Sequence, residues 1–186
     1  RIERLKQEYE IQTRWTAFPL HPDTPKDGLS LEELFAGRSL DINQMRTLLK
    51  RVADELGLPY GDRKKTYNSR LAQELGKWAE SKGSGDEFHN AVFQAYFVDG
   101  KNIGEIPELV HLAQSVRLPG EEAQKVLQTR AFKKAVDSDW SRAHTMGVNA
   151  VPTFVINQRA VMGAQPYEVL VQLMRVNKVR KRQTSR

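Results

Sequence analysis

A single proline near the C-terminus separates a long stretch of helical pattern from a short run of strand-forming residues. It is Pro152, which follows Val151 and precedes Thr153-Phe154-Val155-Ile156. Proline has a fixed φ and no backbone N–H, and it pushes the preceding residue into an extended conformation. The sequence therefore predicts a bend at Val151 where the chain enters a sheet, with backbone groups at an open edge. The local sequence allows either a cis or a trans Val151–Pro152 bond.

The stretch from Leu29 to Met146 is almost wholly helical in its apolar spacing. Asp41 predicts the cap of a helix that ends at Gly57, with its apolar residues on one face. Asn68 or Ser69 starts the next helix, which ends at Gly83. Further helix starts are expected at Asp86, Pro107 and Pro119, and a sixth helix is expected around Phe132 and Val136.

Strand patterns flank this helical block. Residues 11–18 alternate and are rich in strand formers, and residues 153–156 and 160–162 predict two strands around a tight turn. Pro166 starts a last helix. Residues 1–9 resemble the end of a helix whose beginning we expect before Arg1. The predicted order is strand, large helical block, strand, strand, helix.

Composition narrows the function classes. The 186 residues suffice for one domain, or one domain with a large insertion. We expect no membrane span, because the apolar runs are only a few residues long, and the absence of an apolar leader favours the cytoplasm. The sequence has no cysteine, which excludes disulfides, thiolate zinc sites and cysteine nucleophiles within these residues.

The net charge of +6 is concentrated at the C-terminus. Six basic residues and no acidic ones follow Met174, so the rest of the chain is neutral. These six residues are Arg175, Lys178, Arg180, Lys181, Arg182 and Arg186. A basic tail on a neutral body is more often a solvated, frayed terminus than a binding arm, so we expect no nucleic-acid partner.

Other polar and aromatic residues form weaker candidates. The four histidines are scattered without metal-ligand spacing, and Asp137 and Asp139 point away from each other on one helix. A group of aromatic residues could line a substrate cleft, but we prefer the interpretation that it packs the helical block against the core. The three tryptophans are interpreted in the same way. The aromatic group consists of Phe88, Phe93, Tyr96 and Phe97, and the tryptophans are Trp15, Trp78 and Trp140.

Several stretches together carry a family resemblance. The C-terminal ones are Gly147-Val148, Val151-Pro152-Thr153-Phe154 and Gly163-Ala164-Gln165-Pro166; the earlier ones are Phe18-Pro19-Leu20 with Pro22, and Asn68-Ser69 with Ala72. They resemble DsbA-type thioredoxin-fold proteins, in the branch of FrnE and the 2-hydroxychromene-2-carboxylate isomerases. The resemblance runs through the whole chain. It implies an α/β, thioredoxin-like fold interrupted by a large all-helical insertion.

This resemblance implies a division of the chain. Residues 1–27 and 131–177 would form the thioredoxin-like core, residues 28–130 the helical insertion, and residues 178–186 the basic tail. The first strand and the start of the first helix are expected before Arg1. Without that strand the neighbouring strands would expose backbone groups, and each unmet buried pair costs about 1–3 kcal/mol.

The resemblance also implies the site. The catalytic residues are expected outside this chain, as a Cys-x-x-Cys motif at the N-terminus of the first helix, where the helix lowers the pKa of a thiol. The Val151–Pro152 bond would be cis and border that motif, with the Val151 backbone open to an extended substrate peptide. Asn68 matches an asparagine that faces the substrate, although Gln73 stands where relatives often carry histidine. The expected substrate-binding residues are thus Val151, Pro152 and Asn68, with no metal.

The first functional hypothesis is a thiol-disulfide oxidoreductase of the DsbA/FrnE type that acts on a protein or small-molecule thiol or disulfide without a cofactor. The second is a glutathione-dependent isomerase or transferase on the same scaffold, with glutathione as its cofactor. The third is a non-catalytic thioredoxin-like module that holds peptides. Nucleic-acid binding through the tail ranks last, and the sequence leaves a homodimer open.

Overall fold

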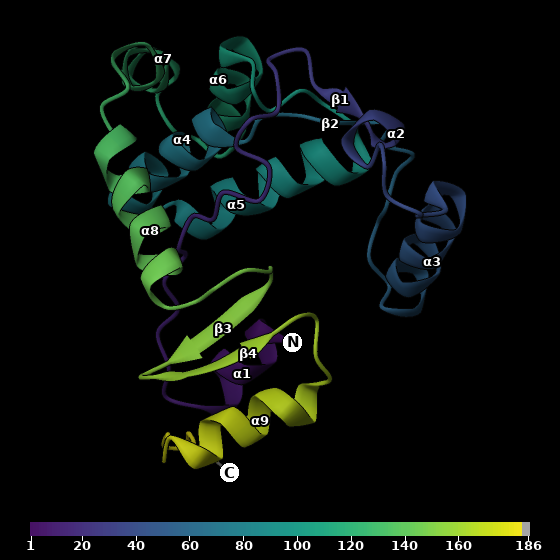
Figure 1. Cartoon of the computed structure of the whole chain (residues 1–186). Coiled ribbons are helices and arrows are strands. Elements are labelled where there is room, and N and C mark those ends of the chain that lie inside the picture. Colours follow the sequence, from purple (N-terminus) through teal and green to yellow (C-terminus); the bar gives the residue numbers. More distant parts are fainter. Residues whose placement is uncertain (184–186) are drawn as a thin grey trace. The chain divides into compact units, whose positions relative to one another are not determined.

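The computed structural model describes residues 1–183, and it divides the chain into two compact units (Figure 1). Residues 1–20 and 139–183 form the first, here called the terminal unit. Residues 21–138 form the second, here called the helical unit. The division falls after residues 20 and 138, whereas the sequence places it after residues 27 and 130.

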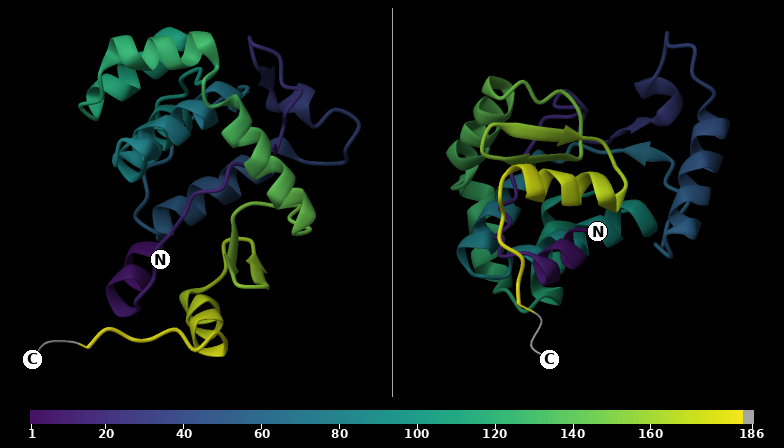
Figure 2. Two further views of the ribbon diagram at one scale, coloured as in Figure 1. Left: turned by 90° about the vertical axis from the view of Figure 1, so that its left-hand side faces the viewer. Right: turned by 90° about the horizontal axis from the view of Figure 1, so that it is seen from below.

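The helical unit contains most of the predicted helices (Figure 2). Its helices are α2 (Leu31–Leu34), α3 (Ile42–Glu55), α4 (Arg70–Ser81), α5 (Gly85–Phe93), the π-helix η1 (Gln94–Val98), α6 (Ile106–Ser115), α7 (Gly120–Thr129) and the first part of α8 (Lys133–Thr145). Two short strands, β1 (Leu29–Ser30) and β2 (Lys65–Thr66), pair in the antiparallel direction. The sequence did not predict β1, β2 or α2.

Side-chain caps fix where several helices begin. The Asp41 carboxylate accepts a hydrogen bond from the Gln44 N–H at 2.9 Å, which confirms the predicted start of α3. At α2 the Ser30 hydroxyl accepts from the Glu33 N–H, and the Glu33 carboxylate accepts from the Ser30 N–H at 2.7 Å. This is a capping box, and its Ser-x-x-Glu spacing can be recognised in the sequence.

Four helices enclose the hydrophobic core of the helical unit. α4 contributes Leu75 and Trp78, α5 contributes Phe88, and α6 and α7 contribute Leu109 and Leu127, all at most 2% exposed. The apolar face formed by α3 and its C-cap Leu56 lies outside this core, since four of its side chains are 40–48% exposed. They are Leu48, Leu49, Val52 and Leu56.

A buried carboxylate lies among these helices. The Glu74 side chain on α4 is 1% exposed and accepts hydrogen bonds from Arg70 at 2.7 Å and, through both oxygens, from Arg130 at 2.7 Å. Arg130 follows α7 with a φ of 53°, and Arg70 also donates to Asp137 on α8. The network therefore ties α4 to the end of α7 and the start of α8.

The terminal unit is built on a hairpin and two helices. Strands β3 (Thr153–Ile156) and β4 (Arg159–Met162) pair in the antiparallel direction around a two-residue turn, as predicted from the sequence. Helices α1 (Ile2–Glu8) and α9 (Tyr167–Val176) contribute the buried core of this unit. That core comprises Leu5, Tyr9, Leu170, Leu173 and Met174.

The predicted strand at residues 11–18 is wrong, because this segment has no strand assignment. A strand requires a hydrogen-bonded neighbour, and among residues 1–183 the hairpin strands pair only with each other. The segment is held by the buried carboxylate of Asp139 on α8, which accepts from the Ala17 N–H at 3.0 Å and from Arg14 at 3.4 Å. Trp15 is 42% exposed, so its expected role in packing is also wrong.

The prediction of a frayed tail is wrong for residues 178–183. Lys181 forms an antiparallel bridge with Tyr9, and the Arg182 guanidinium donates to the carbonyl oxygens of Lys6 at 2.9 Å and Tyr9 at 3.1 Å. The last carbonyls of a helix have no partner within it, so the basic side chain replaces that partner. The final three residues of the predicted tail, 184–186, lie outside the described residues.

No helix among residues 1–183 has the length and apolar character needed to cross a bilayer.

Glu74→Gln is expected to lower the free energy of unfolding at pH 7 by about 1–3 kcal/mol, because it removes the buried charge that binds Arg70 and the partly exposed Arg130. Burial alone would raise the pKa of Glu74, but Arg130 and Arg70 hold it below its ordinary value of 4.5. The stabilisation is therefore fully present above about pH 4.5 and is lost as the pH falls through the lowered folded-state pKa. Urea unfolding of both proteins from pH 7 to pH 3 checks this.

The control is Glu87→Gln, at an exposed position of α5, for which we expect a change within about 0.5 kcal/mol. An unchanged gap between wild type and Glu74→Gln at low pH would contradict the electrostatic interpretation.

Candidate functional site

Val151 and Pro152 lie at the entry to β3 in the terminal unit, and their peptide bond is cis. The Pro152 carbonyl oxygen accepts from the Gly163 N–H at 2.8 Å, which extends the β3–β4 ladder by one residue. Val151 is 45% exposed. Among residues 1–183 its backbone N–H and C=O have no hydrogen-bond partner, so they are open to an additional extended chain.

Local contacts fix the loop that leads to this point. α8 ends with Gly147 at a φ of 69°, a conformation that favours glycine, and the Val148 N–H returns to the Ala143 carbonyl at 3.0 Å. Beyond it, the Thr153 hydroxyl donates to the Ala150 carbonyl at 2.6 Å. The loop is therefore bonded on both sides of Val151 while Val151 itself is not.

Asn68 lies in the helical unit, just before α4. Its side-chain N–H groups donate to the carbonyls of Pro22 at 3.1 Å and Thr24 at 2.8 Å, and its side-chain oxygen accepts from the Arg70 N–H at 2.9 Å. Both amide hydrogens are thus used to join the 22–24 loop to the start of α4. The predicted contact of Asn68 with substrate stays a prediction.

The aromatic group divides into a buried and an exposed part. Phe88 is fully buried, which confirms its packing role, whereas Phe93 and Phe97 are 43% and 37% exposed. Arg63 lies over the Tyr96 ring at 4.4 Å and over Phe97 at 5.7 Å, and it donates to the Tyr96 hydroxyl at 2.7 Å. The sequence analysis missed Arg63, whose only signal is its place in the basic run before Asn68.

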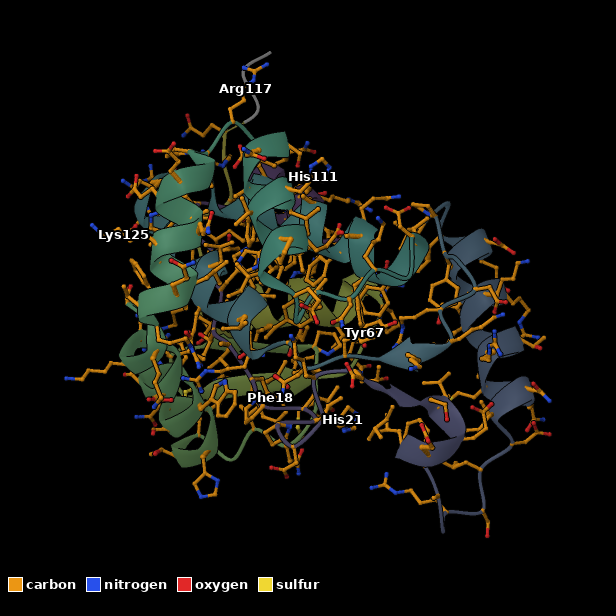
Figure 3. All side chains as sticks on the ribbon, turned by 90° about the horizontal axis from the view of Figure 1, so that it is seen from above. Phe18, His21, Tyr67, His111, Arg117 and Lys125 are labelled. Atoms are coloured by element: carbon orange, nitrogen blue, oxygen red, sulfur yellow. The ribbon has the colours of Figure 1, made fainter. Side chains whose placement is uncertain are left out.

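The surroundings of His21 in the helical unit are electropositive. Burial lowers the pKa of His21, and the nearby charges of Arg38 and Arg63 lower it further. Its ring meets Phe35 edge to face at 6.5 Å. Figure 3 shows His21 and His111 far apart on this unit, and no group of side chains among residues 1–183 has the makings of a metal site.

Comparison with known proteins identifies the family to which the chain belongs. The sequence model of the DSBA-like thioredoxin domain matches residues 1–175. The chain belongs to this family. The thioredoxin-like α/β fold expected from the sequence is thereby confirmed.

Individual relatives agree with the family. The uncharacterized protein YwbO of Bacillus subtilis is 27% identical over 176 residues, which cover 86% of this chain and 79% of YwbO. A probable DsbA oxidoreductase from Streptomyces coelicolor superposes with a TM-score of 0.80 and 26% identity, over 92% of this chain and 77% of that one. A 2-hydroxychromene-2-carboxylate isomerase shares the fold, with a TM-score of 0.73 and 19% identity over 95% and 85% of the two chains.

Asn68→Ala is expected to lower the free energy of unfolding by about 1–3 kcal/mol, because it leaves two loop carbonyls and one helix N–H without their partner. Asn90→Ala on α5, at an exposed position, is the matched control and should change it by less than about 0.5 kcal/mol. Urea unfolding measures both. Equal stability of Asn68→Ala and wild type would contradict a structural role and leave only the predicted contact with substrate.

Proposed function

We propose that this chain is the scaffold and substrate-binding part of a thiol-disulfide oxidoreductase of the DsbA/FrnE type, whose Cys-x-x-Cys motif lies upstream of Arg1. The observation that carries the proposal is the unpaired, exposed backbone of Val151 in a DSBA-like thioredoxin domain. An extended peptide that pairs with these groups would present its disulfide beside the loop. The family membership and the Streptomyces coelicolor neighbour support the redox chemistry.

The edge of β3 supports an upstream strand. Among residues 1–183, β3 pairs only with β4, so its other side has no ladder, and the 11–18 segment in the same unit has none either. One strand between them would satisfy both sets of backbone groups. In such a sheet the helix that follows the strand begins with its positive dipole end at the site, which favours a thiolate over a thiol.

The chemistry would be thiol-disulfide exchange. The thiolate attacks a substrate sulfur, a mixed disulfide forms, and the second cysteine releases the reduced substrate while the enzyme takes up the disulfide. The described residues supply the peptide-binding edge at Val151 and the scaffold around it. A cytoplasmic location stays a prediction.

Turnover by the full-length polypeptide tests the proposal. With its natural upstream residues, it is expected to reduce the disulfides of insulin in the presence of dithiothreitol, faster than dithiothreitol alone. Alkylation of its thiols should abolish this activity, since the thiolate is the nucleophile. Insulin reduction that is no faster than the dithiothreitol background would contradict the oxidoreductase proposal.

Val151→Pro tests the role of the Val151 backbone. Proline removes the N–H that would donate to the substrate peptide, so insulin reduction should fall by about three- to tenfold, the equivalent of one hydrogen bond. Reduction of glutathione disulfide, which is too short to pair along the edge, should change less. Val151→Ala keeps the N–H and is the matched control. Equal losses on both substrates would contradict peptide pairing at this residue.

A glutathione-dependent isomerase or transferase is the second candidate, favoured by the fold shared with the 2-hydroxychromene-2-carboxylate isomerase over 95% of this chain. It requires serine or threonine at the upstream motif position. Saturable glutathione binding without insulin reduction would favour this candidate over the oxidoreductase.

A further inference from the structure

The outer edge of β4 has free backbone groups. The inward hydrogen bond from Gly163 to Pro152 fixes the alternation along the hairpin, so Arg159 and Val161 face β3 while Ala160 and Met162 direct their N–H and C=O groups outward. Among residues 1–183 no second strand pairs with β4. The Met162 carbonyl already accepts from the Gln165 side chain at 2.9 Å, so these two residues of β4 present two N–H donors and the Ala160 carbonyl to solvent.

Natural proteins usually protect such an edge with proline, lysine, a bulge or a covering segment. β4 has none of these residues in its four positions, Arg159–Met162. Its only charge, on Arg159, lies at the end next to the turn. Ala160 is exposed and Met162 is 48% exposed, and the Gln165 side chain bonds only the Met162 carbonyl, so both N–H groups of the edge stay open.

An apolar groove runs beside this edge. It has a volume of about 580 Å³ and lies between β4 and α9, which follow each other in the hairpin-to-helix arrangement of Figure 1. On the α9 side it is lined by one helical row at spacings of three and four residues: Val169, Gln172, Leu173 and Val176. The valines at the two ends of the row are 36% and 39% exposed.

The two charged residues of the groove lie at its opposite ends. Asn157 in the turn donates to Asn177 at 3.0 Å, which places the C-terminal end of α9 beside Arg159. Glu168 is in the first turn of α9, about 12 Å away along the helix at 1.5 Å per residue. Both are exposed, and within the described part of the chain neither forms a direct ion pair, although Glu168 interacts electrostatically with Arg4 of α1.

We propose that this face is the interface of a symmetric homodimer, in which β4 pairs antiparallel with β4 of a second copy. A twofold axis at Val161 brings Ala160 of each copy opposite Met162 of the other, so that both outward N–H groups of each edge are paired. The Met162 carbonyl then accepts a second hydrogen bond besides the one from Gln165. The same axis sets the two α9 rows antiparallel, with Val169 against Val176, and brings Arg159 near Glu168 of the partner subunit.

Charge complementarity favours a second copy of this chain as the partner that binds the groove and the β4 edge. Because the groove carries a positive end and a negative end, it matches itself when reversed, which is what a twofold interface requires. An extended peptide from another protein would fill the edge without needing charges in this order. The upstream strand proposed above would pair with β3, so the outer edge of β4 remains free whether or not that proposal holds.

The test is charge reversal in the full-length polypeptide, read by sedimentation velocity over a range of concentrations. Arg159→Glu and Glu168→Arg are each expected to raise the dimer dissociation constant by about tenfold or more, because like charges then meet twice in the symmetric interface. The combined variant restores both pairs, so its constant should return to within about threefold of wild type. Arg142→Glu, an exposed position of α8, carries the same charge change and should have no effect.

Hydrogen exchange adds a second readout. The amides of Ala160 and Met162 are expected to gain protection as the wild-type concentration rises, and to stay unprotected in Arg159→Glu. A wild-type protein that stays monomeric at every concentration would overturn the proposal. So would a dimer that neither single reversal weakens, or a combined variant that dissociates as readily as the single ones. Loss of insulin reduction with dimerisation intact would count only against the proposed redox function.

Discussion

The need of strand backbone groups for partners governs the terminal unit. A two-stranded hairpin has two outer edges, and a hairpin alone is marginal in water unless further strands or a helix cover it. In this chain α9 and α1 cover one face of the hairpin with buried side chains, but the edges stay open. The proposed functions follow from these edges: a strand and a substrate peptide beside β3, and a second copy beside β4.

In the helical unit the main requirement is that several short helices are held in one arrangement. Burial of its apolar core supplies most of the stabilisation, and the Glu74 hydrogen bonds fix how the helices are oriented. A buried carboxylate with two guanidinium partners is satisfied in only one geometry, so it fixes α4 against the end of α7 more specifically than apolar packing can. Asn68 performs a similar role at the other end, between the 22–24 loop and α4.

The sequence predicted elements whose signals are local. Asp41 caps α3, Ser69 precedes α4, Pro166 precedes α9, and the β3–β4 hairpin lies where alternation and the turn placed it. The sequence-based predictions were wrong where the structure of a segment depends on residues far away in the chain. Residues 11–18 have the composition of a strand, but a strand needs a neighbour that residues 1–183 do not supply.

The same reason accounts for the tail and for part of the site. Basic composition suggests a solvated terminus, and nothing in residues 178–183 reveals that the carbonyls of α1 need them. Val151 and Pro152 were predicted from a motif, and among residues 1–183 the Val151 backbone has no hydrogen-bond partner. Arg63 was missed because stacking on Tyr96, 33 positions later, leaves no trace in local spacing.

The docking of the C-terminal segment has a consequence for α1. The last carbonyl groups of α1 have no partner within the helix, so its last turn depends on donors from elsewhere in the chain. The Arg182 guanidinium and the Tyr9–Lys181 bridge supply hydrogen-bond partners to the last turn of α1. A version of the protein shortened to Val176 would therefore keep α9 complete and yet leave the last turn of α1 without these partners.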